Sequence, residues 1–151
     1  MTTELNGNPV KILLVEDNPG DIRLTKEALR EGKVYNEMHV ATDGLEALAF
    51  LRQKGQYANA PRPDVVLLDL NLPLMNGVEV LAEIKADPHL KRIPVIVLTT
   101  SEDERDILKS YDLHANAYVT KPVDLERFIE IIEQIEGFWL TIVKLPPTEQ
   151  K

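Results

Sequence analysis

Short apolar runs, each followed by a polar or charged residue, recur along the chain. Four of them are continuous and rich in β-branched residues, which is typical of strands buried on both faces of a sheet. They lie at residues 10–15, 65–68, 95–98 and 117–120. A shorter run at residues 38–41 predicts a fifth strand, the second along the chain.

Between these runs, apolar residues recur at the spacing of amphipathic helices. The first such segment stops near Gly32, and Asp43-Gly44 opens the second. A third follows the strand at 65–68, and further helices are predicted at residues 103–111 and 125–135. The positions expected to form the apolar stripes of the first three helices are Ile22, Leu24, Ala28 and Leu29; Ala47, Leu48 and Leu51; and Val78, Leu81, Ala82 and Ile84.

Strand and helix therefore alternate five times, which predicts an α/β fold. Because crossovers between parallel strands are right-handed, helices should cover both faces of a five-stranded parallel sheet. We predict the doubly wound, flavodoxin-like order 2-1-3-4-5, whose switch point lies between the first and third strands. We expect one domain at residues 10–136, a flexible N-terminus at 1–9 and a C-terminal extension at 137–151.

Composition narrows the class of protein. The formal net charge of −8 argues against nucleic acid and anionic membrane as partners, because both attract basic surfaces. The chain has no cysteine, which excludes disulfides and thiolate metal sites. It shows no signal peptide and no apolar run of membrane-spanning length, so a cytoplasmic protein is expected.

Charged and hydroxyl side chains follow the predicted strands where each one ends. They are Glu16, Asp17, Asp69, Thr99 and Lys121. In an open parallel sheet, the carboxyl ends of the strands line the ligand-binding crevice, so these side chains should meet there. Three acids, a hydroxyl and an ammonium suit a divalent cation together with a phosphoryl group.

The predicted chemistry follows from these residue types. Mg²⁺ prefers one or two carboxylates and completes its shell with water and phosphate oxygens; we expect Mg²⁺, with Mn²⁺ or Ca²⁺ able to replace it. Asp69 could attack phosphorus, since aspartyl phosphates are established covalent intermediates. Lys121 would contact one phosphoryl oxygen, Thr99 a second and the cation the third.

Four motifs carry a resemblance to a known family. VEDN, LLDLNLPLMNG, PVIVLTT and AYVTKP occur in order at the ends of strands one, three, four and five. Together they resemble the receiver domain of two-component response regulators, over about residues 10–136. The loop near Pro61 and the tail FWLTIVKLPP are similar to the single-domain regulators paired with cyanobacterial phytochromes.

The resemblance implies specific roles. It makes Asp69 the phospho-acceptor, places Glu16 and Asp17 at the magnesium ion, and has Asn71 give a backbone carbonyl to the metal. Thr99 and Tyr118 would form the switch pair, and Lys121 would contact the phosphoryl group. The donor would be a sensor histidine kinase, and the narrower likeness points to a phytochrome. The chain would then be a signalling switch rather than an enzyme, catalysing only its own phosphotransfer and autodephosphorylation.

Two other functions are left open. A phosphohydrolase with an aspartyl-phosphate intermediate would carry a second acid two residues after the nucleophile, where this chain has Asn71. A pseudo-receiver scaffold would have lost the chemistry, yet the acidic, hydroxyl and lysine positions are all filled. Purely structural roles are also open: Asp17 and Thr99 could serve only as caps of the helices that follow them.

The C-terminal third predicts a homodimer. Residues 137–151 are too few for an output domain, so the output is expected to be contact with a downstream protein. The last predicted helix already has a core stripe, yet more apolar residues follow it, which is typical of an interface. The stripe comprises Leu125, Phe128, Ile129, Ile132 and Ile135, and the additional apolar residues are Ile131, Phe138, Trp139, Leu140, Ile142, Val143 and Leu145.

Overall fold

Five parallel strands form one sheet in the computed structural model, which describes residues 9–31, 35–99, 113, 115, 117–121 and 126–127. Their order is β2-β1-β3-β4-β5, as predicted. The strands are β1 (Val10–Val15), β2 (Asn36–Ala41), β3 (Val65–Asp69), β4 (Val95–Thr99) and β5 (Ala117–Thr120). β2 begins two residues before the predicted run, because its polar first residues still pair with β1.

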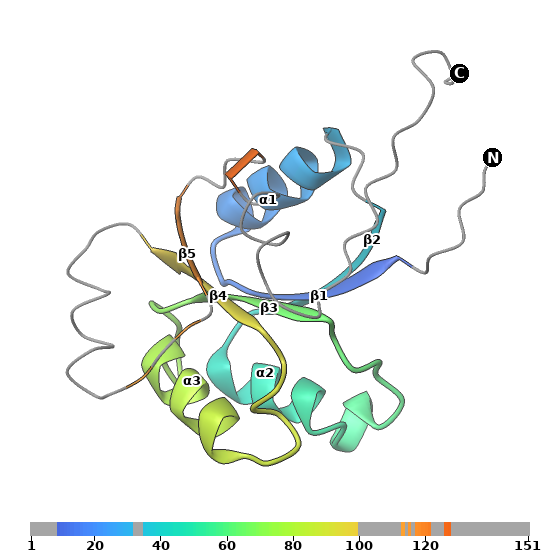
Figure 1. The fold of residues 1–151 in the computed structure, drawn as a ribbon, viewed down its shortest axis with the longest axis vertical. Coiled ribbons are helices and arrows are strands. Elements are labelled where there is room, and N and C mark those ends of the chain that lie inside the picture. The colour runs from blue at the N-terminus through green and yellow to red at the C-terminus, as the bar shows by residue number, and fades with distance from the viewer. Residues whose placement is uncertain are drawn as a thin grey trace.

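Helices cover both faces of the sheet (Figure 1). α1 (Pro19–Glu31) lies on one face, and α2 (Gly44–Leu51) and α3 (Gly77–Ala86) lie on the other. A short 3₁₀ turn, η1 (Gly55–Tyr57), follows α2. Successive residues of a strand point to opposite faces, so β1 and β3 supply buried side chains to two separate cores.

The helix starts follow from local capping. The side chain of Asp43 accepts a hydrogen bond of 2.7 Å from the backbone N–H of Glu46, so α2 opens where predicted. Asn76 and Glu79 cap α3 reciprocally, each side chain accepting from the other residue's backbone N–H. These caps fix the residue at which each helix begins after the loop that follows a strand.

Two predicted stripe positions are wrong. Leu24 is 50% exposed, whereas Thr25 and Leu29 of the same helix, α1, are buried. Leu24 lies on the outer side of the helix, while the polar Thr25 is buried because its hydroxyl donates to the carbonyl of Asp21. Ala82 is exposed. The apolar side chains of α3 that are buried are those of Val80, Leu81 and Ile84.

Several predictions fall outside the described residues. They include the helix at 103–111, the extension at 137–151 and most of the helix at 125–135, of which Glu126 and Arg127 are described and helical. None of the described helices is long and apolar enough to cross a membrane.

A close backbone approach fixes the loop between β3 and α3. The backbone N–H of Gly77 donates to the carbonyl of Leu70 over 2.9 Å. A Cβ atom at residue 77 would lie 2.5 Å from the Cα of Leu70 and closer still to the carbonyl oxygen of Asp69. Only glycine therefore allows α3 to begin so near the end of β3.

Candidate functional site

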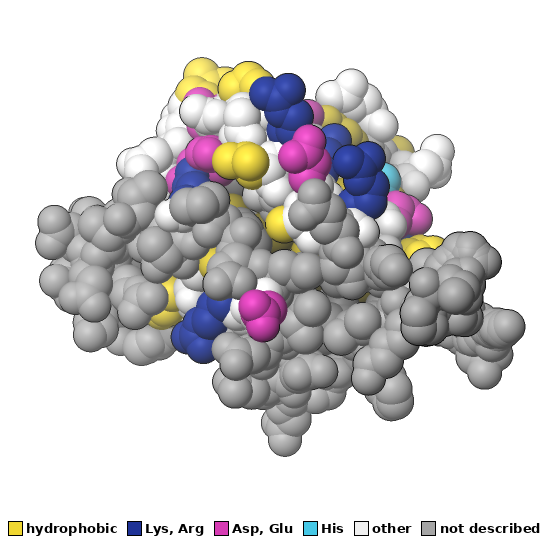
Figure 2. All heavy atoms as spheres, turned by 90° about the horizontal axis from the view of Figure 1, so that it is seen from above, with side chains coloured by type: hydrophobic (Ala, Val, Ile, Leu, Met, Phe, Trp, Pro, Cys, Tyr) yellow, Lys and Arg dark blue, Asp and Glu magenta, His cyan; other side chains and the backbone are white. Residues whose placement is uncertain are grey.

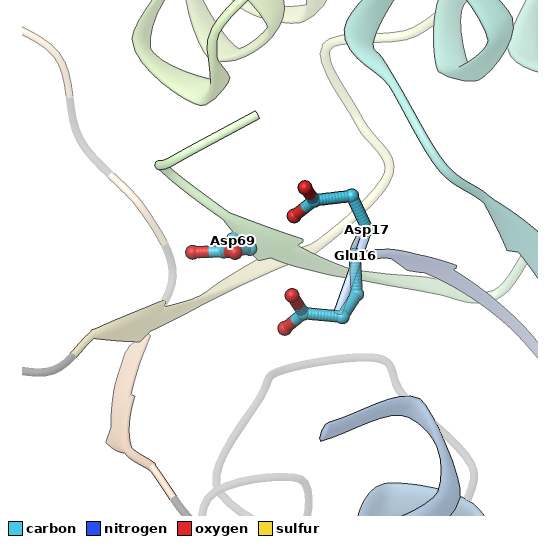
Figure 3. Close-up of side chains that lie close together, drawn as sticks. All are labelled: Glu16, Asp17 and Asp69. Atoms are coloured by element: carbon cyan, nitrogen blue, oxygen red, sulfur yellow. The ribbon is translucent and has the colours of Figure 1, made fainter. Parts of the chain in front are cut away.

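Three carboxylates meet at the carboxyl end of the sheet. Glu16 and Asp17 directly follow β1, and Asp69 ends β3, which pairs with β1 so that Val15 lies opposite Leu68. One carboxylate oxygen of each residue lies within 4.8 Å of the others. Figure 3 shows the side chains of Glu16 and Asp17 both directed toward the end of β3 that carries Asp69. The predicted acidic cluster is therefore present.

Two of these carboxylates are buried. Glu16 is 1% exposed and Asp69 is 3% exposed, whereas Asp17 is exposed. Burying like charges side by side is costly unless a cation compensates for them. Lys121, which follows β5, supplies one: its Nζ lies 2.9 Å from Oε1 of Glu16 and 3.3 Å from Oδ2 of Asp69.

Backbone donors orient the buried acids. The N–H of Asn71 donates to Oδ1 of Asp69 over 3.2 Å, and the N–H of Asn18 donates to Oε2 of Glu16 over the same distance. Each carboxylate thus has one oxygen held by the backbone and the other facing Lys121. The side chains are fixed before any ligand arrives.

The site carries more negative than positive charge, and the pKa values reflect this. Burial raises the pKa of Glu16 to about 7, and the neighbouring Asp69 adds to the rise while Lys121 opposes it. Burial alone would lower the pKa of the Lys121 ammonium, but its pairing with Glu16, Asp69 and Asp21 outweighs burial and raises it. The ammonium stays charged, and without another cation Glu16 takes up a proton at a higher pH than an exposed glutamate does.

A divalent cation fits this donor set. Mg²⁺, Mn²⁺ and Ca²⁺ bind oxygen ligands, and carboxylates from two neighbouring strand ends provide them. One ammonium does not balance three acids, so a second cation would relieve the remaining repulsion. The charged side chains visible on the α1 side are of both signs (Figure 2).

One charged residue at the site was not predicted. Asp21, in the first turn of α1, places Oδ2 3.2 Å from Nζ of Lys121. In the sequence it looks like an ordinary acid at a helix start, where the helix dipole favours negative charge. Nothing else in the sequence distinguishes Asp21 from such an acid, because its contact with Lys121 depends on how the first turn of α1 sits at the crevice.

The other predicted site residues are placed less fully. Tyr118 lies in β5, partly buried against the core on the α2–α3 side of the sheet. Thr99 ends β4 opposite Thr120, but its side chain lies outside the described residues. Asn71 is exposed and uses its N–H toward Asp69; a role for its carbonyl stays a prediction.

Known proteins are similar to this chain in sequence and in fold. The family model "Response regulator receiver domain" matches residues 12–133. Response regulator Rcp1 from Synechocystis is 54% identical over 140 residues, covering 92% of this chain and 95% of that protein.

Two solved structures extend the comparison. The phosphorylated cyanobacterial phytochrome response regulator RcpA is 59% identical, with a TM-score of 0.71, covering 87% of this chain and 94% of that one. The Mn²⁺-bound form of Rcp1 is 53% identical, also with a TM-score of 0.71, covering 91% and 99%. By sequence, topology and the acidic cluster between β1 and β3, the chain belongs to the response regulator receiver family.

Proposed function

We propose that this response regulator accepts a phosphoryl group on Asp69, with Mg²⁺ bound, and thereby switches a protein-interaction surface. The observation that carries the proposal is the buried Asp69 carboxylate, which lies beside the acids after β1 and 3.3 Å from the ammonium of Lys121. The family resemblance makes a sensor histidine kinase the donor. In the transfer, an Asp69 oxygen bonds to phosphorus as the bond from phosphorus to the donor nitrogen breaks.

Glu16, Asp17 and Asp69 would hold the metal, together with the backbone carbonyl of Asn71. When bound, Mg²⁺ neutralises charge on the phosphoryl oxygens. The relative Rcp1 has been solved in an Mn²⁺-bound form, which supports Mn²⁺ as a substitute in this chain. The chain's own contribution is to shield the carboxylates of Glu16 and Asp69 from water and to orient them with backbone N–H groups. Both effects are in place before the kinase docks.

Lys121 and Thr99 would stabilise the added group. The ammonium of Lys121 already lies 3.3 Å from Asp69, so a small movement brings it to a phosphoryl oxygen. Thr99, at the end of the neighbouring strand β4, would donate its hydroxyl to another oxygen. Positioning and charge neutralisation of this kind account for most of phosphoryl-transfer catalysis.

The switch would then pass through Tyr118. Its ring packs against the same core cluster that includes Leu68 and Leu70, the residues flanking Asp69 in the chain. If Thr99 is drawn toward the phosphoryl group, Tyr118 on the neighbouring strand β5 would follow it. Phosphorylation would in this way shift the population of two arrangements of the β5 surface.

The proposed partners are a sensor histidine kinase, specifically a phytochrome, a downstream protein and a second copy of the chain. The relative RcpA, a phytochrome response regulator solved in phosphorylated form, supports the first. The apolar residues of the C-terminal third support the homodimer. The proposed place of action is the cytoplasm, where kinases of this kind deliver the group.

Two assays test this function against its rivals. With a small phosphodonor and Mg²⁺, the chain should incorporate no more than one phosphoryl group per molecule. It should not turn over phosphomonoesters such as p-nitrophenyl phosphate. Sustained turnover would instead indicate a phosphohydrolase, and no incorporation from either a small donor or a phytochrome kinase would indicate a pseudo-receiver.

A further inference from the structure

The ammonium of Lys121 has three carboxylate partners, and they are not equivalent. Glu16 and Asp69 belong to the cluster that would hold a divalent cation, at 2.9 Å and 3.3 Å from Nζ. Asp21 lies outside that cluster, at 3.2 Å. It comes from α1, whereas the others come from the ends of β1 and β3.

Asp21 is firmly held in place. Its backbone N–H donates to Oδ1 of Asn18 over 3.0 Å, and its carbonyl accepts from the hydroxyl of the buried Thr25 over 2.9 Å. Its side chain is 34% exposed, whereas the Lys121 side chain, 13% exposed, is largely enclosed. Two hydrogen bonds thus hold the backbone of Asp21, and its carboxylate lies 3.2 Å from Nζ of Lys121.

We propose that Asp21 is a positioning residue, which holds the ammonium of Lys121 when a divalent cation occupies the cluster of Glu16, Asp17 and Asp69. The inference rests on the proposed function and deepens it. A cation bound to Glu16 and Asp69 competes with the ammonium for the same carboxylates, and the two positive charges repel each other. Asp21 gives the ammonium a partner that the cation does not use, so both charges remain in the crevice.

This arrangement has a measurable consequence. Without the Asp21 carboxylate, Lys121 depends on Glu16 and Asp69 alone and competes more strongly with the cation. Groups that act on a metal site through a neighbour commonly change metal affinity by about 10- to 100-fold. Because Asp21 is partly exposed to solvent, which weakens its interactions, we expect the lower end, a roughly tenfold weaker affinity.

The test measures Mg²⁺ binding alone, by calorimetry, for the full chain and for Asp21→Asn. Glu27→Gln is the matched control, because it removes the same charge from the same helix at a residue with no described contact to Lys121. We expect about tenfold weaker Mg²⁺ binding for Asp21→Asn and less than about a twofold change for Glu27→Gln, by the same reasoning. Unchanged affinity in Asp21→Asn would overturn the inference.

A double-mutant cycle separates positioning from plain charge. In a Lys121→Met background, Asp21→Asn should no longer weaken Mg²⁺ binding. If it weakens binding equally in both backgrounds, Asp21 acts on the cation directly and the positioning role is wrong.

Should the Lys121→Met variant not fold, ¹⁵N NMR of the lysine ammonium groups replaces the double-mutant cycle. With saturating Mg²⁺, the Lys121 ammonium signal should persist in the parent and broaden away in Asp21→Asn; equal persistence in both would contradict the proposal.

The failure of this inference is distinguishable from that of the proposed function. If the parent chain binds no Mg²⁺ and takes no phosphate, the function itself is wrong. If the parent does both and the Asp21 variants behave like the parent, the positioning role alone is wrong.

Discussion

Glu16 and Lys121 form a buried ion pair, with Oε1 and Nζ 2.9 Å apart, that joins the end of β1 to the residue after β5. The pair alone does not neutralise the crevice, since Asp69 is buried beside it. The metal-free crevice therefore holds more carboxylates than Lys121 neutralises. This imbalance makes the chain sensitive to pH, to the loss of Lys121 and to the metal.

The stability of the metal-free chain should fall as pH rises from about 4.5 to about 7. The folded-state pKa of Glu16, about 7, lies above its ordinary value of 4.5, so the folded chain binds this proton more tightly than the unfolded chain does. The stability that this proton contributes is complete below pH 4.5 and is lost as pH rises through about 7. Urea unfolding across this pH range and above it, in the presence of a chelator, measures the decline.

Glu16→Gln is the control for this prediction, because an amide cannot titrate. The variant should show almost no change in unfolding free energy over the same pH range. Saturating Mg²⁺ should also remove the decline in the parent, since it favours the ionised carboxylate. A parent that becomes steadily more stable with rising pH in the absence of metal would contradict the assignment.

Replacing Lys121 with alanine should leave Mg²⁺ binding nearly intact or slightly tighter while impairing the response to phosphate. The ammonium competes with the cation for Glu16 and Asp69 but meets the phosphoryl group directly. The metal-free variant should lose about 3 kcal/mol of stability, because two buried carboxylates lose the cation that pairs with them. Calorimetry gives the affinity, and NMR of Tyr118 with beryllofluoride gives the response; a collapsed Mg²⁺ affinity with a normal response would reverse these roles.

Gly77→Ala should destabilise the fold and slow phosphorylation. A Cβ there would overlap the backbone of Asp69 and Leu70, so the end of β3 must shift, at a cost of about 1–3 kcal/mol. Gly55→Ala provides the contrast: it meets no atom within 4 Å but has φ +61°, which costs about 1 kcal/mol and leaves the crevice untouched. Thermal unfolding and labelling rates distinguish them, and equal labelling rates in both variants would rule out the proposed role of Gly77.

The homodimer prediction rests on the apolar C-terminal third. Sedimentation of the intact chain should give a dimer, and a chain ending at Glu136 should give a weaker dimer or a monomer. Removing Phe138, Trp139 and the apolar residues after them takes away the aromatic centre of the interface. An intact monomer, or a dimer indifferent to the truncation, would exclude this interface.

Much of the fold was predictable because its central strands, β1, β3 and β4, are largely buried on both faces. Continuous β-branched runs marked β1, β3, β4 and β5, and the alternation with helices gave the order of the sheet. The meeting of Glu16 and Asp69 followed as well, since the carboxyl ends of neighbouring parallel strands lie side by side. These features depend on local sequence and on topology, which a pattern can reveal.

The remaining features depend on side-chain direction, which a pattern does not determine. Asp21 reaches Lys121 only because α1 returns its first turn to the crevice. Thr25 is buried because a hydrogen bond to the carbonyl of Asp21 satisfies its hydroxyl, whereas apolar Leu24 is exposed. From the sequence alone, a polar residue that hydrogen-bonds to its own helix is predicted to be exposed. An apolar residue on the solvent side of a helix is predicted to be buried.

Phosphorylation of Asp69 is the central claim, and intact-mass spectrometry after incubation with acetyl phosphate tests it most directly. The parent should gain one phosphoryl group with Mg²⁺ and none with a chelator, because the crevice needs the cation to neutralise the transferred charge. Asp69→Asn, which keeps the size of the side chain but removes the nucleophilic carboxylate, should gain none under either condition. Equal incorporation in Asp69→Asn, or incorporation that survives chelation, would contradict the account.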